Sequence, residues 1–184
     1  GFMLPMTCYF PKWIEAESYK TVTEKQVISF IKRCIITRYG IPSKIVCDNG
    51  SQFISDLTKN YCKKWGIKLS YSTSGLPQAN GQTESSNKIV ISCLKKKLDA
   101  GKGRSAEELP FVLLADRTTP KTSTGQTSYS LVYGCEIVLP AEVAYPTTRY
   151  RTVEQNSSLL IGYLDSVNEL RDQASIRLAS YIRP

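Results

Sequence analysis

Apolar residues recur along the chain with two different periods, and these predict strands followed by helices. Residues 2–10 and 12–18 are predicted to be two β-strands joined by a tight turn at Pro11. From Thr23 the spacing becomes helical in TEKQVISFIKRCIITRYG, with a capping threonine, a final glycine and apolar positions at Val27, Phe30, Ile31, Cys34 and Ile35. This pattern predicts an amphipathic helix of about four turns after the opening hairpin.

The next stretch alternates strand and helix signals. SKIVCD predicts a short buried strand, because its apolar run lies between turn signals at Pro42 and Asn49-Gly50. Asp48 therefore stands at the carboxyl end of a strand. SDLTKNYCKKWG predicts a helix that ends at Gly66, and IKLSYS predicts a further strand.

Helical patterns dominate the second half. After a loop in TSGLPQANGQ, we expect helices in TESSNKIVISCLKKKLD, around Pro110 in residues 104–116, at 127–133 and at 154–181. The order strand, strand, helix, strand, helix, strand, helix predicts an α/β fold, a mixed sheet flanked by helices. We expect residues 1–150 to form the domain and residues 151–184 to form a helical tail or linker.

The composition of the chain favours some classes of protein and argues against others. A chain of 184 residues, 41% of them hydrophobic, can bury the core of one main domain. The formal charge of +8 favours a polyanionic partner. The six scattered cysteines form no CxxC pair and histidine is absent, which argues against a zinc finger and a disulfide framework. The scattered cysteines predict reduced, mostly buried thiols in an intracellular protein. No apolar run is long enough for a membrane span, so we expect a soluble protein without a membrane partner.

Two carboxylates are candidates for chemistry. Thirty-five residues separate Asp48 from Glu84, which falls in the first turn of its predicted helix. In α/β sheets chemistry gathers at the carboxyl ends of strands, and paired carboxylates suit Mg²⁺. The alternative is that Asp48 only forms a turn and Glu84 only caps a helix. Spacing leaves both readings open.

Several motifs, in order and over nearly the whole chain, resemble the integrase core of gypsy-type long-terminal-repeat retrotransposons, especially the plant elements. They are YFPKWIEAES, TRYGIPSKIVCDNGSQF, GIKLSYSTSGLPQANGQTESSNK and ELPFVLLADRTTPKTSTGQTSYSLVYG. The resemblance implies a ribonuclease H-like fold and two-metal polynucleotidyl transfer, in which element DNA ends are trimmed and joined to target DNA. Asp48 matches the family's second catalytic aspartate, and Glu84 matches its glutamate.

Cys8 departs from the family pattern. The opening motif usually reads DYFTKW, with an aspartate that we interpret as the first catalytic one, whereas this chain reads CYFPKW. A thiol is mostly protonated at neutral pH and too soft to replace a carboxylate on Mg²⁺. We therefore expect binding of Mg²⁺ or Mn²⁺ to be weakened or lost and strand transfer to be impaired. Asp116, where relatives commonly have an aromatic residue, is a second departure.

The resemblance also implies partners. Lys88 lies one turn beyond Glu84 on the same helical face, where its ammonium can meet a DNA phosphate; weaker candidates for DNA contacts are Gln82, Asn87 and Lys95. Element and target DNA, a homodimer or higher oligomer, and a nuclear location follow from the family. The family's flanking zinc-binding and C-terminal modules are not expected in this chain. The alternative is an inactive remnant that acts only in DNA binding or protein interaction.

Overall fold

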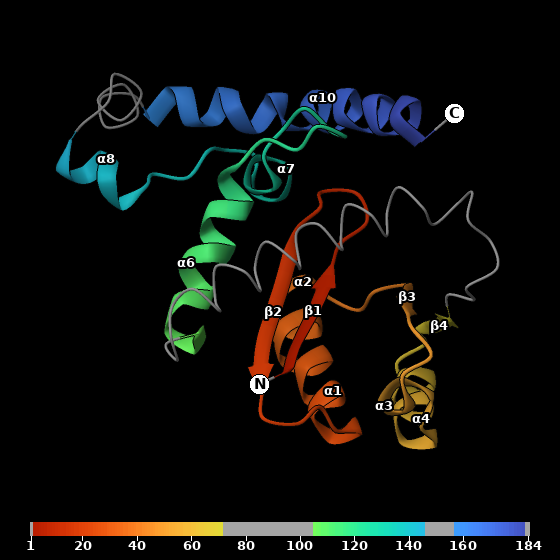
Figure 1. Cartoon of the computed structure of the whole chain (residues 1–184). Coiled ribbons are helices and arrows are strands. Elements are labelled where there is room, and N and C mark those ends of the chain that lie inside the picture. The colour runs from red at the N-terminus through yellow and green to blue at the C-terminus, as the bar shows by residue number, and fades with distance from the viewer. Residues whose placement is uncertain (1, 72–104, 146–156, 183–184) are drawn as a thin grey trace. The chain divides into compact units, whose positions relative to one another are not determined.

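The computed structural model describes residues 2–71, 105–145 and 157–182 (Figure 1). The chain divides into two compact units. Unit 1 contains Gly1–Met6 and Glu15–Pro110, and unit 2 contains Thr7–Ile14 and Phe111–Pro184. Each unit is described by itself.

A hairpin opens the chain, as predicted, but its strands are displaced from the expected bounds. Strand β1 spans Phe2–Thr7 and pairs with β2, Ile14–Tyr19. The connection is wider than a tight turn at Pro11, because the Cys8 N–H donates to the Trp13 carbonyl over 2.8 Å and Lys12 takes a φ of 54°. A left-handed residue ends the regular strand geometry. The short connection makes the two strands antiparallel.

The predicted long helix is present, with an unpredicted change of pitch. It comprises α1 (Glu24–Phe30), the π-helical segment η1 (Ile31–Ile36) and α2 (Thr37–Tyr39). The backbone N–H of Thr23 donates to Gln26 Oε1 over 2.8 Å at its start, and Gly40 ends it with a φ of 86°. Its buried residues are Val27, Phe30, Ile31 and Cys34.

Strand β3 (Lys44–Cys47) and strand β4 (Lys68–Tyr71) form a parallel pair in which Lys44 lies opposite Lys68. Helix α4 (Asp56–Lys64) connects them as predicted, and the short helix α3 (Ser51–Ile54) before it was not predicted. The expectation that β3 is buried is wrong for Val46. This side chain is 59% exposed because it alternates with Ile45, which is 8% exposed.

One hydrophobic core holds unit 1 together. Leu4 from β1, Phe30 from α1, Ile45 from β3 and Cys62 from α4 belong to the same buried cluster. The strands that the structure describes form two separate pairs, β1–β2 and β3–β4, rather than one continuous sheet. The mixed α/β class predicted from the sequence is confirmed.

Unit 2 is mainly helical. Its elements include α7 (Ser128–Tyr133), α8 (Pro140–Ala144), α10 (Ser157–Ile182) and most of α6 (Ser105–Thr118), in which Pro110 lies inside the helix. Arg171 of α10 donates to the carbonyls of Leu131 and Val132 at the end of α7, each over 3.0 Å. Ala174 and Leu178 of α10 are buried. The tail residues 166–182 are therefore anchored to α7.

Among the helices that the structure describes, none has the length and apolar character needed to cross a membrane.

Candidate functional site

Asp48 stands where the sequence predicts it, directly after β3, and its side chain is exposed. Its Oδ1 accepts the backbone N–H of Gly50 over 3.0 Å. A Cβ at position 50 would lie 3.0 Å from that oxygen and 2.6 Å from Gln52 Nε2, so glycine permits this close turn. The carboxylate is thus both a turn former and an exposed group at the strand end. The two readings of Asp48 are compatible.

Cys8 follows β1, and its thiol is free and exposed. It belongs to unit 2 and Asp48 belongs to unit 1. Glu84, Lys88, Gln82, Asn87 and Lys95 lie outside the residues that the structure describes. The family resemblance also predicts that Cys8, Asp48 and Glu84 converge at one end of the sheet, and this stays a prediction.

The family resemblance implies a Mg²⁺ site. The donor atoms of Cys8 and Asp48, the two predicted site residues that the structure describes, do not fit this ion. Within residues 2–71, 105–145 and 157–182, no group of three histidine, cysteine, aspartate or glutamate side chains could hold a metal ion. Of the two predicted positions described there, Asp48 offers a hard carboxylate and Cys8 offers a soft thiol. We therefore derive no reaction step through a metal.

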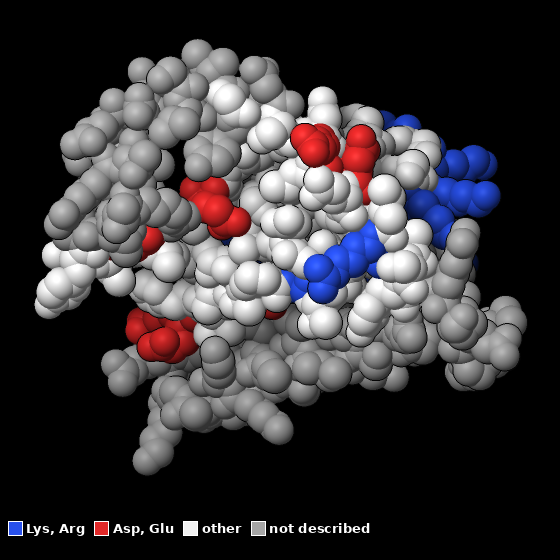
Figure 2. All heavy atoms as spheres, turned by 90° about the horizontal axis from the view of Figure 1, so that it is seen from above, with Lys and Arg blue, Asp and Glu red and all other residues white. Residues whose placement is uncertain are grey.

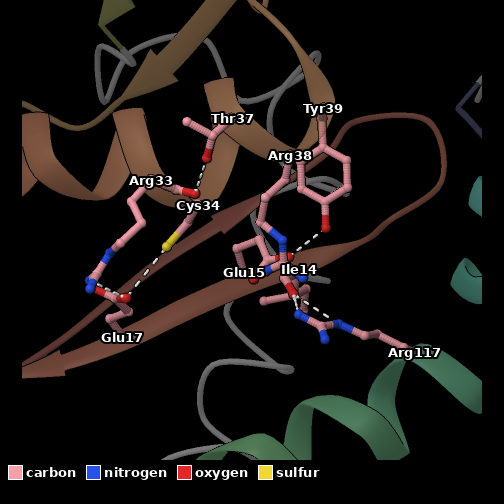
Figure 3. Close-up of polar contacts among 9 residues, drawn as sticks. All are labelled: Ile14, Glu15, Glu17, Arg33, Cys34, Thr37, Arg38, Tyr39 and Arg117. Carbon is pink, nitrogen blue, oxygen red and sulfur yellow. Dashed lines mark hydrogen bonds and ion pairs between the residues drawn. The ribbon is translucent and has the colours of Figure 1, made fainter.

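Glu15, on β2, is a buried carboxylate engaged in an ion pair. Its Oε1 lies 2.9 Å from Arg38 Nη1 and accepts the Tyr39 hydroxyl over 2.5 Å (Figure 3). The Glu15 side chain is 7% exposed, whereas that of Arg38 is 45% exposed. Glu15 therefore attaches β2 to the end of the long helix and is committed to structure rather than to a metal.

Glu17, two residues further along β2, forms a second network on the same helix (Figure 3). It accepts from Arg33 Nη2 over 2.5 and 2.6 Å, from the Cys34 thiol over 3.4 Å and from the Tyr19 hydroxyl. Burial opposes ionisation of Glu17, but these hydrogen bonds and the Arg33 charge together lower its pKa. Burial and the neighbouring carboxylate raise the pKa of Tyr19 to about 12 and that of Cys34 to about 11.

Trp13 is the centre of an aromatic cluster in unit 2 that sequence reasoning missed. The Arg117 guanidinium lies 4.3 Å from the Trp13 ring centroid, and its Nη2 donates to the Ile14 carbonyl over 2.8 Å. Tyr133 meets the Trp13 ring edge-on at 5.6 Å, and Tyr129 lies 4.7 Å from Tyr133. Trp13 and Ile14, which follow Cys8 in the hairpin, are therefore held in place by residues of α6 and α7.

Exposed lysines supply a candidate nucleic-acid surface in unit 1. Lys44 and Lys68 are partners in the β3–β4 register, so their exposed side chains lie on the same face of the pair. Like charges at neighbouring strand positions are unfavourable unless an anion or solvent separates them. Figure 2 shows one face of the molecule, with lysine and arginine in blue and aspartate and glutamate in red.

Comparison with known proteins shows which families the chain resembles. Residues 2–77 match the family described as the integrase core domain. This segment includes the hairpin, the long helix, Asp48 and β4. The chain is 30% identical over 134 residues to the Gag-Pol polyprotein of Avian reticuloendotheliosis virus, and 33% identical over 134 residues to that of Feline leukemia virus. The alignments cover 72% of this chain but only 12% and 8% of the two polyproteins.

A solved structure supports the fold. The cryo-EM structure of the simian T-cell lymphotropic virus intasome in complex with PP2A regulatory subunit B56 gamma contains a chain that matches with a TM-score of 0.60 and 22% identity. The match covers 74% of this chain and 50% of that one. The solved structure therefore supports the fold, while residues 2–77 resemble an integrase core domain and the chain is similar to retroviral polyproteins. These matches do not test the more specific assignment to gypsy-type retrotransposons.

Proposed function

We propose that the chain is the integrase core of a gypsy-type retrotransposon, a nuclear protein that binds element and target DNA and works as a homodimer or higher oligomer. Its polynucleotidyl transfer is impaired by Cys8. The observation that carries the proposal is the position of Asp48 at the carboxyl end of β3, within the segment that matches the integrase core domain.

The proposed chemistry assigns different roles to the carboxylates. Asp48 and Glu84 belong to the site that acts on DNA, since both match catalytic positions of the family. Glu15 and Glu17 are excluded from that role because each is engaged with an arginine of the long helix. With a thiol at position 8, the site has one hard ligand fewer than the family requires.

DNA binding rests on cationic side chains rather than on metal ligands, so it persists in this chain. Lys88 is proposed to neutralise a phosphate beside Glu84, with Gln82, Asn87 and Lys95 as weaker contacts. Among the described residues, the Lys44–Lys68 pair suits a phosphate because its two ammonium groups share one exposed face.

Titration of duplex DNA binding against salt tests this function. Each lysine that neutralises a phosphate contributes about 0.9 to the slope of log affinity on log salt concentration. Lys88→Ala and Lys68→Ala should each lower the affinity and reduce the slope by about one unit. Lys59→Ala is the matched control, because Lys59 lies 3.9 Å from Asp56.

The second candidate function is protein interaction alone, by a chain that lost its catalytic role, and Cys8 is the observation that favours it. Salt-sensitive DNA binding separates the two. A parent chain that does not bind DNA at low salt, or a Lys88→Ala variant with unchanged affinity and slope, would contradict the assignment of the DNA surface.

A further inference from the structure

Helices α1 and α4, both in unit 1, border a shallow groove of about 460 Å³. The lining residues come from both helices: Lys25, Ile28, Leu57, Asn60, Tyr61 and Lys64. On α4, Leu57, Tyr61 and Lys64 are spaced by four and three residues, which places them on one stripe. On α1, Lys25 and Ile28 are spaced by three. Two helical stripes therefore face the same groove.

The groove combines apolar surface with positive charge. Ile28, Leu57 and Tyr61 supply the apolar surface, and Leu57 is 45% exposed. The lining includes Lys25 and Lys64 but no carboxylate. An occupant that brings apolar side chains and carboxylates would match both the apolar lining and the two lysines.

We propose that this groove binds an acidic amphipathic helix of a partner protein. A third helix can lay its apolar stripe between the stripes of α1 and α4, and its acidic residues can then meet Lys25 and Lys64. A second copy that docked groove to groove is a poorer occupant, because it would set the lysines of the two grooves against one another. Duplex DNA would pair with the lysines but leave the apolar surface exposed.

The inference does not depend on DNA strand transfer, so it can fail or hold separately from the proposed function. The probe is a fluorescein-labelled synthetic helix with leucine on one face and glutamate on the other. Two control peptides replace every leucine by serine or every glutamate by lysine. Fluorescence anisotropy measures their binding to the full chain, with circular dichroism to confirm that each variant is folded.

Lys63 and Lys64 provide a matched pair of variants, since both are exposed and adjacent on α4 but only Lys64 lines the groove. Lys64→Glu should weaken binding of the acidic helix by about tenfold or more, whereas Lys63→Glu should change it by less than about threefold. Leu57→Ser should weaken it at every salt concentration. Neither control peptide should bind comparably.

Equal losses from Lys63→Glu and Lys64→Glu would overturn the proposal, as would equal binding of the leucine-free peptide, because both results indicate nonspecific charge attraction. A concentration-dependent dimer that only Lys64→Glu disrupts would assign the groove to a second copy instead. A larger effect of Lys64→Glu on duplex DNA than on the acidic helix would assign it to nucleic acid.

Discussion

Arg38 Nη1 lies 2.9 Å from Glu15 Oε1, so an exposed helix end holds a carboxylate that is almost completely buried on β2. Removing Arg38 takes away the guanidinium that lies against that carboxylate. Arg38→Met should therefore destabilise the protein by about 2 kcal/mol, less than a fully buried pair would lose because the arginine is partly solvated. Urea unfolding measures the change. If Arg38→Met and Glu15→Gln are additive in the double variant, the two residues do not interact.

Glu17 should make the free energy of unfolding depend on pH. Its folded pKa lies below the ordinary value of 4.5, so the folded state binds this proton less readily than the unfolded state does. The resulting stabilisation is present above pH 4.5 and is lost as the pH falls through the lower, folded pKa. Glu17→Gln should flatten the dependence of the unfolding free energy on pH in this range. Asp172→Asn, at an exposed carboxylate outside the network, is the matched control variant.

The thiols should differ in reactivity. Burial raises the pKa of both Cys34 and Cys47 to about 11, so little thiolate is present near neutral pH. Cys8 is exposed and free. Iodoacetamide at about pH 8 should label Cys8 well before Cys34 and Cys47, as peptide mass spectrometry can measure. Labelling of Cys34 as rapid as that of Cys8 would show that the long helix does not stay packed on β2.

Replacing Arg117 should measure how much its contacts with the Trp13 cluster stabilise the protein. Arg117→Ala removes the guanidinium over the ring and the hydrogen bond to the Ile14 carbonyl, at a cost of about 2 kcal/mol. Arg117→Lys should recover only part of this loss, because an ammonium does not reproduce the planar fork. In a Trp65→Phe background, Trp13 fluorescence follows the unfolding. Full stability of Arg117→Ala would contradict the packing described for unit 2.

The parts of the fold that are local in sequence were predictable. Thr23 and Gly40 mark the ends of the long helix, and Asn49-Gly50 marks the end of β3, because caps and turns depend on neighbouring residues. The hydrogen bond between Arg117 and the Ile14 carbonyl could not be predicted, since the two lie 103 positions apart in sequence. The π-helical segment η1 also lacks a local signal in IKRCII.

The candidate site was predictable to a smaller extent. The strand-end position of Asp48 follows from a short apolar run and a turn, and the structure confirms it. The engagement of Glu15 and Glu17 depends on which face of β2 meets the long helix. Sequence alternation shows that the two side chains share a face but does not identify its partner.

Disintegration activity with Mg²⁺ or Mn²⁺ tests whether Cys8 impairs catalysis, with the parent chain compared beside Cys8→Asp and Cys8→Asp/Glu84→Gln. We expect little or no activity in the parent, a metal-dependent gain in Cys8→Asp, and loss of that gain when Glu84 is also replaced. Metal-free DNA binding should stay nearly constant across the three proteins. Robust Mg²⁺-dependent turnover by the parent that Glu84→Gln abolishes would contradict the claim that Cys8 impairs catalysis. A folded, DNA-binding Cys8→Asp protein without any gain would show that position 8 does not supply the third carboxylate.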